Sequence, residues 1–226
     1  MRSLLFTYSA AFLLLYSLNA SYANFEIQRH IKEFEDAAFA SCNGSTATDK
    51  VTLHKYQTMY GMFFMPALQA HQRAIDELVI QRKFKMLEIG MGCDMRYGAG
   101  KSVLLWKYLL KSYGDLWMAE SDEKCARAFI ADGRADGYSI LVGDQQNVTV
   151  LEQWVSESGG GFDVIIDDGG HHFAEIKHSF DVLFHRALLP GGLYFIEDLH
   201  VSNYPYMRNG SPLPREHDLG PACMGG

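Results

Sequence analysis

The chain has 226 residues, of which 48% are hydrophobic and 21% are charged. This length and composition fit one globular domain with a full hydrophobic core, and they exclude a chain that is mostly disordered. The formal net charge of −7 argues against a general nucleic-acid-binding protein, because such proteins carry basic patches that neutralise phosphates. The four cysteines are too few for a disulfide scaffold, and no motif pairs them at zinc spacing.

Residues 1–23 are typical of a secretory signal peptide. Arg2 precedes a nearly continuous apolar run over residues 3–18, and the small residues Ser21 and Ala23 follow in the pattern that a signal peptidase reads, so we predict cleavage after Ala23. One alternative is an uncleaved signal-anchor that holds the chain to a membrane through residues 3–18, although a bilayer span needs about 20 residues; another is a misassigned start. Both signal readings place the domain in the secretory pathway or outside the cell, where conditions are oxidising.

A helical segment is expected next, over residues 24–82. Residues 25–42 carry apolar side chains at helical spacing, and residues 55–82 have a similar pattern that Pro66 interrupts. From residue 83 on, short apolar runs alternate with amphipathic segments. The runs predict strands at 84–90, 115–120, 138–144, 162–170 and 190–198, with helices at 100–113, 122–133, 148–158 and 172–189. This alternation predicts an α/β fold with a doubly wound, Rossmann-like parallel sheet.

The ends of the first two strands carry residues suited to a nucleotide. Ligands of such sheets bind beyond the carboxyl ends of the strands. The first strand ends in Glu88, Gly90 and Gly92, and the glycines allow a ligand to approach backbone N–H groups, although a plain turn is the alternative. The second strand ends in Glu120, an acid that can accept both hydroxyls of a ribose or can simply start a solvated loop.

The end of the third strand adds one candidate residue, and residues 98–102, after the first strand, contain a misleading motif. Asp144, followed by Gln145, can accept from an adenine amino group or cap the next helix. Residues 98–102 look like the end of a phosphate-binding P-loop, but that loop needs glycine where the chain has Met95. The failed spacing argues against nucleotide hydrolysis, and we expect Lys101 and Ser102 to open a helix.

The most informative group of residues, a cluster of acids with a histidine, follows the fourth and fifth strands. Asp168 and His171 follow the fourth strand, and Glu197 and Asp198 end the fifth. If the two strands are neighbours, three carboxylates converge, and they repel one another unless a cation lies between them. Oxygen ligands of this kind favour Mg²⁺, Mn²⁺ or Ca²⁺ over zinc. A neutral His171 would then be suited to act as general base on a substrate hydroxyl.

With these motifs, the chain resembles the class I S-adenosylmethionine (SAM)-dependent methyltransferases, and most of all the macrocin and mycinamicin group of sugar O-methyltransferases. The likeness runs from about Asp49 to Leu199. Residues 88–92 resemble the first SAM motif, with Cys93 in place of its third glycine. The resemblance implies that the cofactor SAM is bound by Glu88, Gly90, Gly92, Glu120, Asp144 and Gln145.

The same resemblance covers the acidic cluster. Residues 168–171 (Asp-Gly-Gly-His) are similar to the group's Asp-Gly-Ser-His, and residues 197–199 to its Glu-Asp-Leu. It implies that Asp168, Glu197 and Asp198 bind Mg²⁺ (or Mn²⁺) and that His171 is the catalytic base. Residues 49–60 also resemble the segment that precedes the sheet in these enzymes and helps to close over SAM, although a capped helix start is the alternative.

The implied function is methyl transfer from SAM to a hydroxyl of a sugar, a glycoside or a related small molecule. Two alternatives are a SAM-binding relic without turnover and an enzyme acting on a catechol or another small-molecule hydroxyl. The class I sheet normally has seven strands, but residues 200–226 contain no strand-like run. We therefore expect the fifth strand to be an exposed edge, and the chain to be truncated or to complete its sheet with a partner, such as a second copy.

Overall fold

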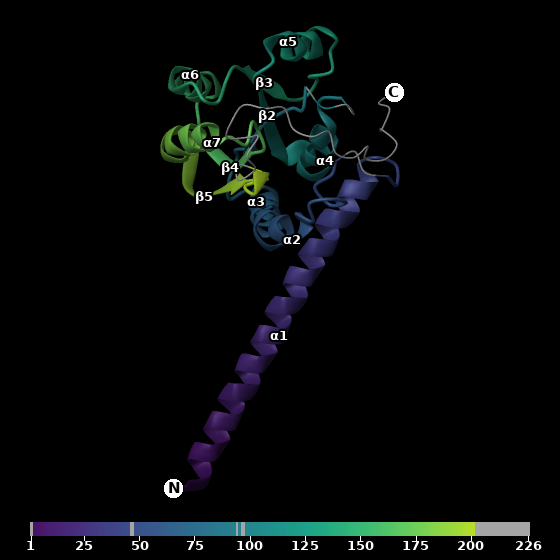
Figure 1. Ribbon diagram of the computed structural model, residues 1–226. Coiled ribbons are helices and arrows are strands. Elements are labelled where there is room, and N and C mark those ends of the chain that lie inside the picture. Colours follow the sequence, from purple (N-terminus) through teal and green to yellow (C-terminus); the bar gives the residue numbers. More distant parts are fainter. Residues whose placement is uncertain (1, 46–47, 94, 96–97, 202–226) are drawn as a thin grey trace.

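The computed structural model describes residues 2–45, 48–93, 95 and 98–201, with side chains from Ser21 onward. An α/β body carries one long helix that projects from it (Figure 1). The predicted tail of residues 200–226 lies outside the described residues from position 202 on.

The sheet has five parallel strands in the order β3-β2-β1-β4-β5 among the described residues. Their bounds are Phe84–Ile89 (β1), Gly114–Glu120 (β2), Ser139–Val142 (β3), Phe162–Asp167 (β4) and Leu188–Ile196 (β5). The predicted doubly wound sheet is confirmed, and β4 and β5 are neighbours. The strand order reverses between β1 and β4, and this is the place where such sheets bind ligands.

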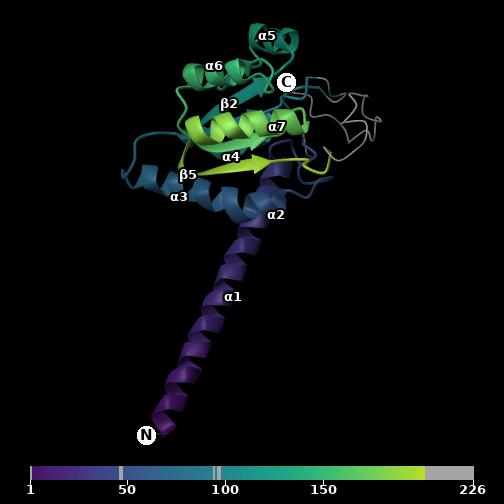
Figure 2. The same cartoon turned by 60° about the vertical axis from the view of Figure 1, so that its left-hand side comes forward.

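Helices cover both faces of the sheet (Figure 2). They are α4 (Lys101–Leu110), α5 (Glu123–Ala131), α6 (Val148–Ser158) and α7 (Phe173–Ser179), with a π-helical turn over Phe180–Phe184 after α7. All four lie where the sequence predicts them. The last one ends earlier than expected, because Leu188 already pairs with Phe162 as part of β5.

The predicted helical segment before the sheet is also present. It consists of the C-terminal part of α1 (Arg2–Ala40), the short α2 (Gln57–Met59), a π-helical turn (Tyr60–Phe64) and α3 (Met65–Asp76). Pro66 lies in the first turn of α3. The interruption expected near Pro66 is present as the π-helical turn, which ends directly before α3.

Apolar side chains from alternate strand positions fill a core on each side of the sheet. One core lies between the sheet and the helices α1, α3 and α4, and it includes Phe34, Tyr60, Phe64 and Trp106. The other lies under α6 and the π-helical turn after α7, and it includes Leu87, Leu151, Trp154 and Ile165. Together they fix the carboxyl ends of β1, β2 and β4 relative to one another.

Helix α1 continues through the predicted boundary at Ala23 without a break. Its C-terminal half packs on the body through Phe34, Ala37 and Ala38, whereas Tyr22 and Phe25 are exposed. Among the described residues, none of the helices combines the length and the apolar character needed to span a bilayer.

Candidate functional site

A cavity of about 910 Å³ opens at the carboxyl ends of the strands, where the strand order reverses. Its wall includes all but one of the predicted site residues: Gly90, Gly92, Glu120, Asp144, Gln145, Asp168, His171, Glu197 and Asp198. The exception is Glu88, which is fully buried. Its carboxylate accepts hydrogen bonds from Ser102 and Trp106, because Glu88 points to the face of the sheet that α4 covers.

The loop after β1 depends on glycine. Gly90 has a φ of +99°, and a Cβ there would lie 2.1 Å from the carbonyl oxygen of Asp168. Its N–H donates to the carbonyl of Ala119 at 2.8 Å. The loop therefore passes between the ends of β2 and β4 with its backbone close to both, as a cradle for a ligand requires.

The carboxylate of Glu120 is buried at the end of β2 and holds the loop in place. One oxygen accepts from the N–H groups of Met91 and Cys93, at 3.2 and 3.4 Å. The other accepts from the N–H of Asp122 at 2.9 Å and from the hydroxyl of Ser121 at 3.3 Å. A carboxylate has about four acceptor positions, so ribose hydroxyls would have to replace the longer of these bonds.

The two residues predicted on the adenine side differ in their surroundings. Asp144 is exposed and accepts from the N–H of Gln146, and the cap of α6 is Asn147. Gln145 is buried, and its amide donates to Asp167 at 2.9 Å and accepts from the N–H of Gly170 at 3.2 Å. Gln145 thus supports the loop after β4. Of the two residues, Asp144 is therefore the one whose side chain is available to the adenine ring of a cofactor.

Lys50 lies among the acids of the site, which the sequence did not reveal. Its side chain is 1% exposed, and Nζ lies 2.8 Å from Asp168, 2.7 Å from Glu197 and 3.2 Å from Glu88. Burial alone would lower the pKa of Lys50, but the three carboxylates outweigh it and raise the pKa well above its usual value. The ammonium group therefore supplies part of the positive charge that the sequence analysis assigned to a metal alone.

Two tyrosines and a histidine from the same N-terminal segment hold the last two acids. Tyr60 donates to Glu197, and Tyr56 donates to Asp198 at 2.6 Å. His54 lies 3.1 Å from Asp198, and this contact and Asp49 raise the pKa of His54 to about 10. The segment that the resemblance placed over SAM therefore contacts the acidic cluster.

In the described part of the chain, Asp168, His171 and Asp198 offer ligand atoms that all lie within 4.8 Å of one another. Nε2 of His171 is 3.9 Å from an oxygen of each acid. His171 and Asp198 have φ values of +60° and +51°, a strained conformation that is common at functional sites. Two carboxylates at this spacing fit a small divalent cation, with the imidazole of His171 beside it, whereas Glu197 faces Lys50 and Tyr60.

Known proteins with similar sequences are sugar O-methyltransferases. The chain is 30% identical over 159 residues to 8-demethyl-8-alpha-L-rhamnosyl tetracenomycin-C 2'-O-methyltransferase of Streptomyces olivaceus, covering 70% of this chain and 36% of that protein. It is 29% identical over 178 residues to mycinamicin VI 2''-O-methyltransferase of Micromonospora griseorubida, covering 75% and 40%. The chain thus spans well under half the length of these relatives. No protein-family profile matches it.

A solved structure has the same fold. The MycE methyltransferase of the mycinamycin biosynthetic pathway, in complex with Mg and SAH, superposes with a TM-score of 0.56 at 25% identity, covering 78% of this chain and 41% of MycE. Both comparisons agree with the resemblance drawn from the motifs. In sequence and in fold, the chain is a relative of the macrocin, mycinamicin and tetracenomycin sugar O-methyltransferases.

Proposed function

We propose that the chain is a SAM-dependent and divalent-metal-dependent O-methyltransferase that acts on a hydroxyl of a sugar or glycoside. One observation carries the proposal: a single cavity contains both the loop at Gly90 with Glu120 and the cluster of Asp168, His171 and Asp198. A nucleoside site and a base beside a cation site are the two parts that methyl transfer from SAM to a hydroxyl needs.

The cofactor end would be bound by Glu120 and the glycine loop. Glu120 would accept the ribose hydroxyls in exchange for its longer hydrogen bonds, those to Cys93 and Ser121. Asp144, exposed on the cavity wall, would accept from the adenine amino group. The backbone of Gly90 and Gly92 would lie against the rest of the cofactor, because no side chain intervenes.

At the acceptor end, His171 would take the proton of the hydroxyl. Asp168 and Asp198 would hold Mg²⁺ or Mn²⁺, which would lower the pKa of the acceptor hydroxyl and orient it. Glu197 is the third metal ligand implied by the motif. It would bind the cation together with Asp168 and Asp198 only if the ammonium group of Lys50 moved away from it. The sugar or glycoside acceptor is supported by the relatives, two of which are named as O-methyltransferases of an alpha-L-rhamnosyl tetracenomycin-C and of L-olivosyl-oleandolide.

An assay of SAH formation with SAM, Mg²⁺ and a panel of glycosides and catechols tests the proposal. We expect turnover with a glycoside and its loss in EDTA. Turnover restricted to catechols would reassign the acceptor. Contacts of Lys50 with Asp168 and Glu197 favour one competing function, a SAM-binding protein without turnover. Binding of SAM with no SAH formed from any acceptor would support that alternative.

We also propose that residues 1–23 direct the chain into the secretory pathway, as a cleaved signal or as a signal-anchor through residues 3–18. The disulfide between Cys93 and Cys125 supports this, because disulfides persist mainly in oxidising compartments. Expression of residues 1–226 in a eukaryotic secretory host, followed by N-terminal sequencing, tests it. A product starting at Asn24 is expected for cleavage; recovery only from the cytosol with an intact N-terminus would contradict both forms.

A further inference from the structure

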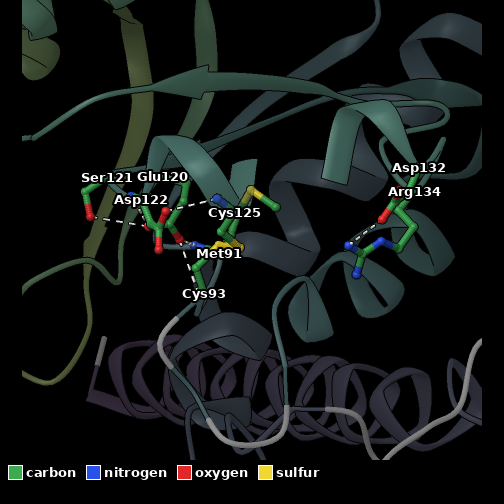
Figure 3. The surroundings of a disulfide bond; sticks show 8 residues. All are labelled: Met91, Cys93, Glu120, Ser121, Asp122, Cys125, Asp132 and Arg134. Carbon is green, nitrogen blue, oxygen red and sulfur yellow. Dashed lines mark hydrogen bonds and ion pairs between the residues drawn. A yellow bond between two sulfur atoms is a disulfide. The ribbon is translucent and has the colours of Figure 1, made fainter. Parts of the chain in front are cut away.

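Cys93 and Cys125 form a disulfide that joins two parts of the cavity wall (Figure 3). Cys93 lies in the loop after β1, at the position of the third glycine of the SAM motif, and it lines the cavity. Cys125 lies in the first turn of α5, and 32 residues separate the two cysteines in the sequence. The bond therefore ties the end of β1 to the helix that follows β2.

One end of the disulfide is hydrogen-bonded to the acid proposed to hold the ribose, and the other end reaches that acid through Asp122. The N–H of Cys93 donates directly to Glu120. The N–H of Cys125 donates to Asp122 at 2.9 Å, and the N–H of Asp122 donates to Glu120 at 2.9 Å (Figure 3). Before the cofactor binds, movement of either cysteine would therefore disturb the carboxylate of Glu120.

Besides the disulfide, hydrogen bonds hold the described part of the loop that carries Cys93. Backbone hydrogen bonds fix its two ends, from Gly90 to Ala119 and from Gly100 to Met91, and two more lie within it, from Met95 to Gly92 and from Gly98 to Met95. Gly100 also packs against Phe129 of α5, where a Cβ would lie 2.8 Å from the ring. Between these ends, Gly92 allows many backbone conformations. The disulfide is the covalent constraint on this stretch.

We propose that the Cys93–Cys125 disulfide positions the cofactor loop, so that the affinity for SAM and SAH depends on its oxidation state. The inference rests on the proposed function, because the ligand is the cofactor assigned there. A loop already held in its binding conformation loses less entropy when the ligand binds. A phosphine reductant converts the bond to two thiols and becomes the phosphine oxide, with its oxygen taken from water. We expect the reduced protein to bind SAH about tenfold more weakly.

Calorimetric titration of SAH into the full chain tests this, before and after treatment with the phosphine. Peptide mass spectrometry of the alkylated protein verifies the linkage of Cys93 to Cys125. The double variant Cys93→Ala, Cys125→Ala is the matched control, because it lacks the bond but contains the other cysteines. It should bind as weakly as the reduced protein, and the reductant should not change its affinity further.

The titrations are made at a temperature at which circular dichroism shows every form fully folded, so that a loss of global stability alone leaves the Kd unchanged. Equal dissociation constants for the oxidised, reduced and variant proteins would overturn the inference and leave the proposed function standing. Free thiols at Cys93 and Cys125 in protein folded under oxidising conditions would also overturn it. Failure of the oxidised protein to bind SAH would instead contradict the proposed function, and the inference about the disulfide would fail with it.

Discussion

Nζ of Lys50 lies 2.7 Å from Oε2 of Glu197, although 147 residues separate the two in the sequence. Both side chains are buried, and the same ammonium group contacts Asp168 and Glu88. A buried charge without a partner is strongly unfavourable. The ion pair therefore connects the N-terminal segment to the carboxyl end of β5, and it does so inside the candidate active site.

Replacement of Lys50 should destabilise the fold. Lys50→Met leaves two buried carboxylates, Glu88 and Glu197, and the partly exposed Asp168 without their cation. We expect a loss of about 3–5 kcal/mol in the free energy of unfolding. Lys177→Met is a matched control, since Lys177 pairs with Asp181 on the surface and such pairs contribute about 0–1 kcal/mol. Urea unfolding measures both. Equal losses in the two variants would show that Lys50 does not hold the acids.

Gly90→Ala should destroy the cofactor loop. The new Cβ would need to occupy the position of the Asp168 carbonyl, in a backbone conformation that already disfavours alanine. Gly133→Ala separates the two effects, because Gly133 also has a positive φ but has open space around it. The control should lose about 1–2 kcal/mol, whereas Gly90→Ala should lose more and fail to bind SAH. Thermal melts with and without SAH distinguish them, and a normal ligand response in Gly90→Ala would refute the placement of the loop.

His171→Ala should separate binding from turnover. His171 touches the acids of the proposed metal site but not Glu120 or the glycine loop, so SAH should still bind within about threefold. Loss of a general base should lower the rate of methyl transfer by about 10²–10⁴-fold. His178→Ala is the control, since His178 lies on α7 and contacts the backbone of Gln146. A rate for His171→Ala close to that of the control would exclude His171 as the base.

Glu120→Gln should weaken cofactor binding about 10- to 100-fold, because hydrogen bonds to a charged acceptor contribute about 1.5–3 kcal/mol. Calorimetric titration with SAH measures the change. The effect should be smaller with a ligand that lacks ribose hydroxyls. An identical loss for SAH and for such a ligand would mean that Glu120 only supports the loop.

The sheet and the wall of the cavity could be predicted because they depend on local patterns. Each strand is a short apolar run, and parallel strands bring their carboxyl ends to one edge. Glu120, Asp168 and Asp198 therefore lie where the sequence suggests. Glu88 shows the limit of this argument: alternation along β1 turns its side chain to the face covered by Trp106, away from the cavity.

The partners of the acids could not be predicted in the same way. Lys50 reaches Asp168 across 118 residues, and Cys93 reaches Cys125 across the loop and β2. Neither pairing produces a periodic pattern in the sequence. The first depends on how the N-terminal segment packs on the sheet, and the second on how α5 does. The segment at residues 49–60 was singled out by resemblance alone, and the contact between Tyr56 and Asp198 gives it a physical role.

The most direct test of the central claim is the thermal melt of the oxidised chain with SAM, in Mg²⁺ and in EDTA. At a concentration about 100-fold above Kd, binding adds about 2.7 kcal/mol to the stability of the folded state. For a chain of this size that corresponds to a rise of about 5–10 °C in Tm. A rise of this size with SAM, larger in Mg²⁺ than in EDTA, is the predicted result. An unchanged Tm in a protein with a clean, cooperative transition would contradict the assignment of the cavity to SAM.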